Sequence, residues 1–298
     1  MSRLTDIALT ATAPVVWGTT YIVSTEFLPG APPLMVAALR ALPAGLLLLV
    51  LTRQLPPRAW LGRVAVLGAL NFAIFWAALF VAAYRLPGGV AATLGAMQPL
   101  IVLVLARLWL GTAMRWQSVV AALAGLAGVA LLILGPGAQL DALGVGAALV
   151  GAVSMAAGTV LSRRWQPPVP PLSFAAWQLT AGGLLLLPVA LLVDPRLPQL
   201  TPATLGALAW LGLVGGAATY WAFFRGIARL GPAAVSGLGF LSPLSAVLLG
   251  WLVLGQALSP LQSLGAVTVL ASVWLGQQAA RAAAQPARSK AAAKSLRV

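Results

Sequence analysis

Long runs of apolar residues fill most of the chain, and short connections rich in proline, glycine and arginine separate them. A helix that crosses about 30 Å of hydrocarbon needs roughly 20 apolar residues. The pattern therefore predicts ten membrane-spanning helices joined by short loops. Their expected ranges are 7–25, 34–52, 63–83, 88–109, 116–134, 141–162, 172–193, 202–224, 232–254 and 260–279.

One stretch of the sequence occurs twice. Residues 85–113 align without a gap to residues 229–257, at an offset of 144, with eleven identities in 29 positions. The second and seventh expected helices align at an offset of 138, which places Arg40 opposite Gln178. Because the matches include arginine, glycine and proline as well as leucine, chance is a poor explanation. The chain is predicted to contain two copies of one unit.

Each copy holds five of the expected helices, and five is an odd number. The second copy must therefore enter the membrane upside down, as in the inverted repeats of many secondary transporters. The predicted fold class is an all-α integral membrane protein with ten transmembrane helices in two inverted five-helix repeats. We expect the first repeat at 1–137, the second at 138–280 and a basic, disordered cytoplasmic tail at 281–298. Weak attraction of this tail to anionic lipid is the alternative to simple solvation.

The composition agrees with a membrane protein and narrows its chemistry. The chain is 61% hydrophobic and only 7% charged, whereas soluble domains carry about 25% charged residues. It contains neither cysteine nor histidine, and none of its four acidic residues falls in the middle of an apolar run. Acid–base catalysis and metal binding need these residue types. The sequence therefore disfavours an enzyme and predicts no catalytic residues, no metal site and no cofactor.

The basic residues indicate how the chain is oriented. With the N-terminus inside, 15 of the 18 lysines and arginines fall on the cytoplasmic side, while only Arg85 and Arg196 fall outside. This bias predicts that both termini are cytoplasmic. It also explains the net charge of +14 without nucleic-acid binding, so the lipid bilayer is the expected partner.

Two prolines lie at equivalent positions in the middle of expected helices. Pro99 in the fourth and Pro243 in the ninth would each remove a backbone hydrogen bond and kink the helix. Gln98 and Ser242 precede them directly, and polar groups at this depth are expected to face protein or a cavity. The prolines are interpreted as hinges beside a substrate cavity, with simple packing kinks as the alternative.

Other polar and aromatic residues near mid-depth could line a cavity that is apolar with a few hydrogen-bonding groups. For each of them, ordinary packing is the alternative. These candidates for substrate binding are Trp17, Asn71, Trp76, Met97, Ser154 and Met155, together with Gln98 and Ser242. Tyr21, Tyr84 and Tyr220 lie nearer the expected helix ends, where they could act as gates or belong to the aromatic belts.

Arg40 is the one basic residue that falls well inside an expected span and not near its cytoplasmic end. It lies roughly 9 Å inside the outer end of its helix, and charge at this depth is a functional-site hypothesis. Glu26, at the outer end of the neighbouring helix, could form a structural ion pair or gate with it. The alternative is that Arg40 binds a carboxylate of the substrate.

Taken in order along residues 7–280, these features resemble the drug/metabolite transporter superfamily, EamA type. The resemblance is carried by Trp17-Gly18, Arg40, Pro99, Pro243 and the two five-helix repeats. One departure is that the second unit has Met155-Ala156 where the first has Trp17-Gly18. The resemblance implies a central cavity lined partly by the third, fourth, eighth and ninth helices, and alternating access by rocking of the two halves.

Within this superfamily the chain is similar to bacterial inner-membrane exporters of amino acids, including aromatic amino acids. We therefore expect a broad amino-acid exporter of the inner membrane. Because no acidic residue or histidine lies mid-span, facilitated transport is favoured, with coupling through Glu26 as an alternative. An exporter of drugs or other small metabolites, a nucleotide-sugar-like carrier, a channel and a lipid enzyme remain alternatives. The oligomeric state stays open, with a monomer as the working expectation.

Overall fold

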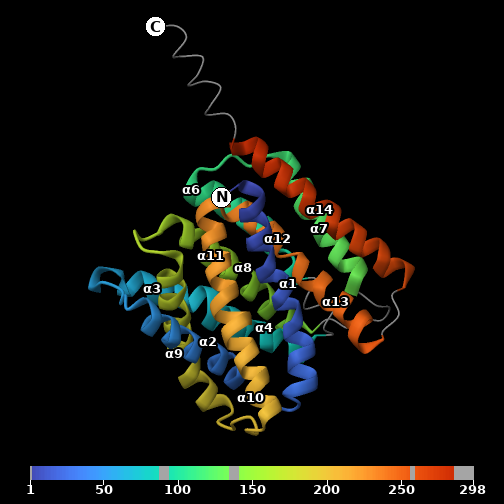
Figure 1. Ribbon diagram of the computed structural model, residues 1–298. Coiled ribbons are helices and arrows are strands. Elements are labelled where there is room, and N and C mark those ends of the chain that lie inside the picture. The colour runs from blue at the N-terminus through green and yellow to red at the C-terminus, as the bar shows by residue number, and fades with distance from the viewer. Residues whose placement is uncertain (1, 87–93, 134–140, 256–258, 285–298) are drawn as a thin grey trace.

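The computed structural model describes residues 2–86, 94–133, 141–255 and 259–284, and within these ranges it contains helices and no strands (Figure 1). The basic tail expected at 281–298 lies outside the described residues beyond Ala284. The helices are α1 (Arg3–Phe27), α2 (Pro33–Thr52), η1 (Arg58–Trp60), α3 (Leu61–Gly68), η2 (Ala69–Ala73), α4 (Ile74–Arg85), α6 (Gln98–Leu110), α7 (Trp116–Ile133), α8 (Ala142–Arg164), α9 (Pro171–Val193), α10 (Pro202–Ala209), η3 (Trp210–Ala218), α11 (Thr219–Leu230), α12 (Pro232–Leu238), α13 (Leu241–Leu254) and α14 (Pro260–Ala284).

The helical segments have the length and surface of a membrane protein. In the described part of the chain, eight of them are long and apolar enough to cross a bilayer, and α6 is a shorter apolar helix. Aliphatic side chains face outward along them, for example Val50, Leu192 and Leu252, which are 70%, 86% and 68% exposed. A large exposed aliphatic surface is stable where hydrocarbon surrounds it, so the membrane class is confirmed.

The third and eighth expected helices share an irregularity. Each runs through a π-helical segment: α3 continues through η2 into α4, and α10 continues through η3 into α11. A π-helical stretch widens the backbone and offsets its carbonyl groups from the regular hydrogen-bond ladder. Carbonyls in these two segments are therefore available to side chains from other helices.

The fourth and ninth expected helices are broken rather than simply kinked. In the ninth, α12 ends at Leu238 and α13 begins at Leu241, with Gly239 and Phe240 between them. Pro243 is the third residue of α13, and Pro99 is the second residue of α6. Proline fits the first turn of a helix, where its missing N–H has no intrahelical partner to lose. The two prolines thus begin new helical segments, a difference from the kink within one helix that the sequence predicted.

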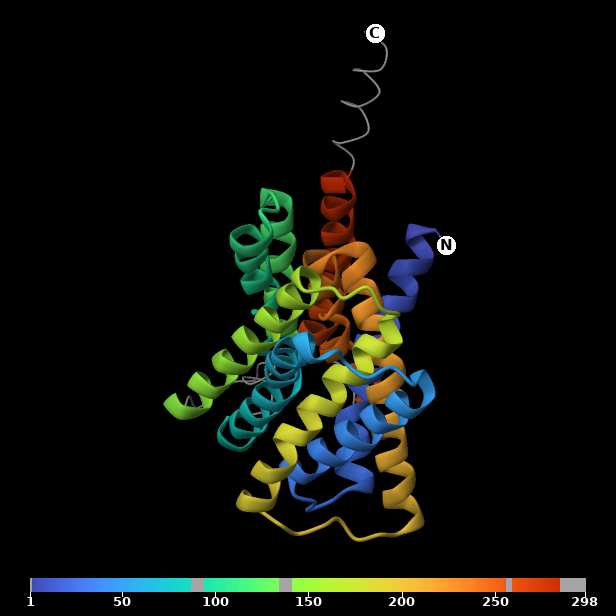
Figure 2. The same ribbon diagram turned by 90° about the vertical axis from the view of Figure 1, so that its left-hand side faces the viewer.

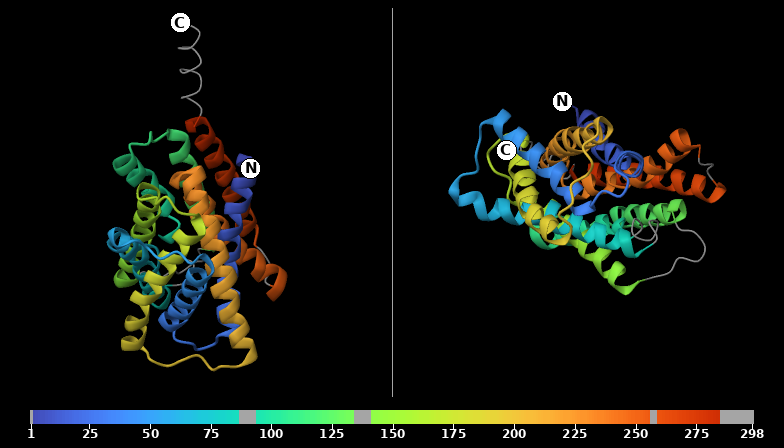
Figure 3. Two further views of the ribbon diagram at one scale, coloured as in Figure 1. Left: turned by 60° about the vertical axis from the view of Figure 1, so that its left-hand side comes forward. Right: turned by 90° about the horizontal axis from the view of Figure 1, so that it is seen from below.

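Helices from the two halves of the sequence pack in pairs. The pairs α2 with α9 and α7 with α14 make extensive contacts, and the aligned glycines Gly45 and Gly183 lie where α2 crosses α9. A Cβ atom at Gly45 would lie 2.5 Å from the backbone nitrogen of Thr180, so this crossing requires a residue without a side chain. The view from below in Figure 3 shows α7, α13 and α14 on one side of the molecule and α3 and α9 on the other, and Figure 2 looks onto the side formed by α3 and α9.

Two long helices pack mainly on elements far away in the sequence. Helix α1 lies against α11 and α13, while α8 lies against α4 and α6. The N-terminal end of α1 and the C-terminal end of α14 lie at the same end of the molecule (Figure 1). These contacts between distant segments bring the side chains of α1, α2, α4 and α11 together around one buried centre.

Candidate substrate site around Arg40 and Tyr220

A cluster of aromatic rings fills this centre. Tyr220 of α11 is 2% exposed, and its ring lies 4.9 Å from that of Trp17, 4.6 Å from that of Phe72 and 6.5 Å from that of Trp76. Phe223, one turn further along α11, packs 5.2 Å from Trp17. These rings come from α1, η2, α4 and α11, so both halves of the sequence contribute to one apolar wall.

The structure places Tyr220 at the centre and not near a helix end. The sequence pattern ended the eighth helix at residue 224, because the charged residues Arg225 and Arg229 follow. The helix instead continues to Leu230, and Arg225 is buried against another charged residue. Tyr220 is therefore enclosed by other rings, and an interior role fits it better than the gate role considered from the sequence.

Arg40 lies beside this aromatic wall. Its guanidinium carbon sits 4.6 Å from the centre of the Trp76 ring, and its Nη2 donates a hydrogen bond of 3.1 Å to the carbonyl of Gly215. The residue is only 9% exposed, and its Nε has no hydrogen-bond partner. None of the ion pairs found among the described residues includes Arg40. The site thus holds a buried cation that no carboxylate of the described chain neutralises.

The Gly215 carbonyl connects Arg40 to Trp17. This carbonyl, in the π-helical segment η3, accepts hydrogen bonds from Arg40, from Trp17 Nε1 at 3.1 Å and from Thr219 Oγ1 at 2.8 Å. Trp17 Nε1 also lies 3.0 Å from Thr219 Oγ1. A carbonyl that the irregular backbone leaves available therefore orients both the guanidinium and the indole.

A second polar cluster surrounds Asn71, which directly precedes Phe72 of the aromatic wall. Asn71 Nδ2 donates to Gln178 Oε1 at 2.7 Å and to Ser162 Oγ at 3.3 Å, and all three residues are buried. A Cβ atom at Gly158 would overlap the side-chain amide of Asn71, so a larger residue there would displace Asn71. A small crevice lined by Ser162, Gln166, Phe174 and Phe224, among others, reaches this cluster.

The two clusters occupy equivalent places in the sequence. Arg40 aligns with Gln178 at the offset of 138, and the offset of 144 aligns Gly215 with Asn71 and Tyr220 with Trp76. The contact of Arg40 with Gly215 therefore corresponds to the contact of Gln178 with Asn71. The sequence prediction of site residues did not include Gln178 or Ser162. The alignment of Gln178 with Arg40 was a signal in the sequence that could have identified Gln178.

The remaining predicted site residues fall into four groups. Ser154 donates a 2.8 Å hydrogen bond to the Leu70 carbonyl just before Asn71, and Met155 is buried in the same apolar core as Trp76. Glu26 is in the last turn of α1, where its side chain is exposed. The side chains of Tyr21 and Tyr84 lie outside the described part of the structure. Met97, Gln98 and Ser242 are half-buried beside the helix breaks.

Comparison with known proteins fits this arrangement. Two stretches of the chain, residues 4–134 and 142–276, each match the EamA-like transporter family. The chain belongs to the EamA-like transporter family. It is thus a multi-pass membrane protein of a superfamily that transports drugs and metabolites, and the resemblance inferred from the sequence is confirmed.

Individual relatives and a solved structure agree with the family. The chain is 45% identical over 277 residues to protein PecM of Dickeya dadantii strain 3937, covering 92% of each chain. It is 32% identical to the uncharacterized inner membrane transporter YedA of Escherichia coli K12, over 88% of this chain and 87% of YedA. One crystal structure matches with a TM-score of 0.78 at 23% identity, covering 95% of this chain and 100% of that one, which supports the fold.

Proposed function

We propose that this EamA-family transporter exports amino acids, aromatic ones among them, across the inner membrane by alternating access. It acts as a facilitative carrier and not as an enzyme. Its substrate binds between the two halves of the chain, with its carboxylate at Arg40 and its side chain against the rings of Trp17, Trp76 and Tyr220. Pro99 and Pro243 act as hinges where the fourth and ninth helices are broken.

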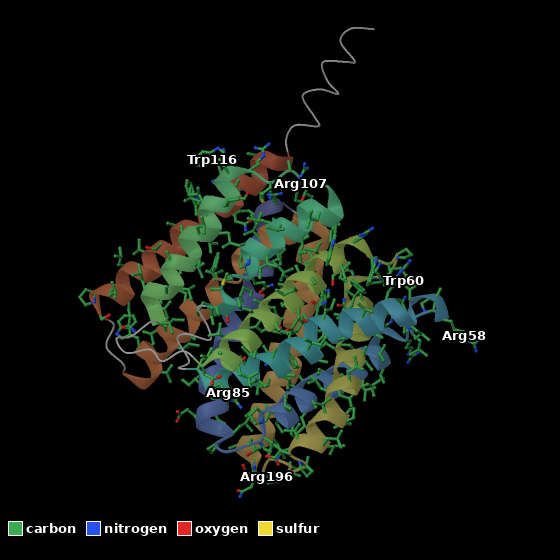
Figure 4. All side chains as sticks on the ribbon, turned by 180° about the vertical axis from the view of Figure 1, so that it is seen from behind. Arg58, Trp60, Arg85, Arg107, Trp116 and Arg196 are labelled. Atoms are coloured by element: carbon green, nitrogen blue, oxygen red, sulfur yellow. The ribbon has the colours of Figure 1, made fainter. Side chains whose placement is uncertain are left out.

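The proposed architecture is two inverted five-helix repeats, 1–137 and 138–280, with both termini in the cytoplasm. Two separate matches to the same family support the division, and the equivalent pairs α2 with α9 and α7 with α14 support a twofold relation between the halves. Figure 4 shows Arg107 and Trp116 near the end of α14 and Arg196 at the opposite end of the molecule. Arg225 and Arg229 also lie at the N-terminal end of α1, against Asp6, and basic residues at this end support its cytoplasmic location.

The uncompensated charge of Arg40 is the single observation that carries the substrate assignment. Removing a cation from water is costly unless an anion or several acceptors replace its hydration shell. Here one carbonyl and the face of Trp76 replace only part of it, and Nε is left without a partner. A substrate carboxylate would supply the missing negative charge and accept a charge-assisted hydrogen bond.

The aromatic wall supports the second half of the assignment. Rings at 4.6–4.9 Å from Tyr220 offer edges and faces on which an apolar or aromatic substrate side chain can pack.

The proposal of facilitated transport is supported by the position of the acidic residues. Asp6 and Glu26 lie in the first and last turns of α1, while Asp141 and Asp194 flank α8 and α9.

Transport by the purified protein in liposomes tests this proposal. Labelled phenylalanine and threonine are offered first at equal pH on both sides and then with a pH gradient. Saturable uptake at equal pH, suppressed by unlabelled amino acids and accelerated by the same amino acid on the far side, is the expected result. The counterflow separates a carrier from a channel.

Two other results would change the proposal in different ways. Uptake that is driven uphill by a pH gradient would keep the substrate class and overturn facilitated transport. If folded protein transported neither amino acid but did transport lipophilic cations, the substrate assignment would be wrong and a drug exporter of the same family would replace it.

A further inference from the structure

One end of α1 is joined to α11 by a buried ion pair. Asp6 Oδ1 lies 2.7 Å from Arg225 Nη2, and both side chains are only 9% exposed. Arg229, one turn further along α11, lies 3.6 Å from the other carboxylate oxygen. The sequence alone did not assign Asp6 any role, because it lies near the N-terminal end of the first expected helix.

The helices around this pair are in direct contact. Thr10 Oγ1 donates a 2.6 Å hydrogen bond to the Asp6 carbonyl, and Thr10 is fully buried. A Cβ atom at Gly226 would lie 2.5 Å from Thr10, so α1 and α11 touch without space for water between them here. Opening this end of the molecule between α1 and α11 therefore requires the ion pair to separate.

An equivalent pair lies at the other end of the molecule. Arg85, which is labelled in Figure 4, lies 3.8 Å from Asp141, the N-cap of α8. The offset of 144 aligns Arg85 with Arg229. Both aspartates stand at the start of equivalent helices, Asp6 in the first turn of α1 and Asp141 just before α8. In each case an arginine from the end of one helix meets an aspartate from the start of a helix in the other half.

The two pairs differ in burial. The aligned arginines Arg85 and Arg229 are equally exposed, at 49% and 50%, but Asp141 is 42% exposed whereas Asp6 is only 9% exposed. The inner site also has Arg225, whose side chain is 9% exposed, and the offset of 144 aligns this arginine with Val81 on the other side. Exposed ion pairs are screened by water and contribute little, so the Arg85–Asp141 pair holds its end only weakly. Separating a buried pair is more demanding, because a charge left without its partner must be hydrated first.

We propose that Asp6, Arg225 and Arg229 form the cytoplasmic latch of the transport cycle, and that Arg85 and Asp141 form its weaker counterpart on the outer side. The inference rests on the proposed alternating access and orientation. It predicts that the substrate-free transporter favours the state closed to the cytoplasm. Opening of the latch then limits how often an outgoing substrate can enter from that side.

The absence of cysteine from the sequence allows a direct test. Thr10→Cys and Ala148→Cys each introduce a single thiol at equivalent buried positions, related by the offset of 138. Position 10 follows Asp6 of the inner pair along α1, and position 148 follows Asp141 of the outer pair along α8. Each is combined with Asp6→Asn or with Asp141→Asn. Asparagine at 141 can still cap α8 through the bond to the Gly144 amide, so only the charge is lost. Labelling by a membrane-impermeant maleimide is measured in right-side-out and inside-out vesicles without substrate.

Asp6→Asn is expected to raise the labelling rate of Cys at position 10 by roughly tenfold, from the cytoplasmic face only, because the closed state loses its buried pair. Asp141→Asn is expected to change labelling at position 148 by less than about twofold. The exchange of Asp6→Arg with Arg225→Asp should bring labelling back toward the original rate, and this variant also shows that the fold tolerates the change. Purified protein that elutes as a single species is the condition for each comparison.

An unchanged labelling rate in Asp6→Asn, or equal effects of the inner and outer substitutions, would overturn the latch. Labelling of position 10 from the outer face would instead refute the orientation. Because no substrate is added, neither result depends on which molecule is carried. If the unmodified protein takes up no amino acid, the proposed substrate is wrong, but the labelling comparison is not affected.

Discussion

The guanidinium of Arg40 lies 4.6 Å from the centre of the Trp76 ring and donates a hydrogen bond to the carbonyl of Gly215. These two contacts hold a buried charge in place without neutralising it. A protein that keeps such a charge loses stability when its site is empty and recovers it when an anion binds. If Arg40 binds the substrate carboxylate as proposed, the stability of the transporter depends on the presence of its substrate.

The first prediction concerns stability in the absence of substrate. Arg40→Gln removes the uncompensated charge but loses the bond to Gly215, so the melting temperature of substrate-free protein is expected to stay the same or rise. Phenylalanine should raise the melting temperature of the original protein and leave that of the variant unchanged. A large fall in the melting temperature of Arg40→Gln without substrate would indicate that the charge is structural.

Trp76 should affect substrate affinity through Arg40. Trp76→Leu removes the ring that faces the guanidinium, which is worth about 0.5–2 kcal/mol, so KM should rise about 2-fold to 30-fold. Trp76→Phe keeps a smaller ring, so its KM should lie between that of the original protein and that of Trp76→Leu. The measurement is initial uptake rate against phenylalanine concentration. Equal KM values for the Leu and Phe variants would contradict this role of the ring.

Two glycines of α8 provide a matched pair for the packing around Asn71. Gly158→Ala would place a Cβ atom in overlap with Asn71 Oδ1, whereas a Cβ atom at Gly146 would meet nothing within 4 Å. The first substitution should destabilise the protein by about 1–3 kcal/mol, and the second should be neutral or stabilise it by up to about 1 kcal/mol. Thermal unfolding of both variants in the same detergent measures the difference. Similar melting temperatures would contradict this placement of Asn71.

The hydrogen bond between Asn71 and Gln178 should be visible as coupling. Each of Asn71→Leu and Gln178→Leu leaves a buried polar group without its partner and should cost about 1–3 kcal/mol. The double variant should cost less than the sum, with a coupling energy of about 0.5–1.5 kcal/mol. Ser162→Ala, which removes contacts of 3.3 and 3.4 Å, should show weaker coupling. Strict additivity of the two Leu substitutions would indicate that the bond contributes nothing.

Pro243 tests the proposed hinge separately from stability. An alanine there could donate its N–H toward the Gly239 carbonyl and join α12 to α13 as one straight helix. Pro243→Ala is expected to keep the melting temperature and lower the maximal transport rate more than it changes KM. Unchanged kinetics would assign the proline to packing alone.

The sequence predicted the features that depend on periodicity and composition. Apolar runs of about 20 residues indicated the membrane class. Trp17, Asn71 and Trp76 were placed near the buried centre. The aligned arginines, glycines and prolines predicted two inverted repeats, and this division stays a prediction. Each of these inferences uses spacing along one helix or between two copies, which a single sequence contains.

The features that depend on packing between distant segments were not predictable. The π-helical segments η2 and η3 arise in helices whose apolar pattern is uniform, so nothing marked the Gly215 carbonyl as an acceptor. Arg225 ended the eighth helix in the sequence pattern, because its partner Asp6 lies 219 residues away. Because the predicted helix ended at residue 224, Tyr220 was expected near a helix end and not at the buried centre. Burial of a charge can be recognised only once its partner is known.

The most direct test of the account is transport of phenylalanine by the original protein and by Arg40→Gln in liposomes, with phenethylamine, which lacks the carboxylate, as a competitor. If Arg40 binds the substrate carboxylate, the variant should raise the KM for phenylalanine by at least about 30-fold, because a buried charge pair is lost. Phenethylamine should then compete weakly and about equally in both proteins. Uptake of phenylalanine by Arg40→Gln with an unchanged KM would contradict the central claim.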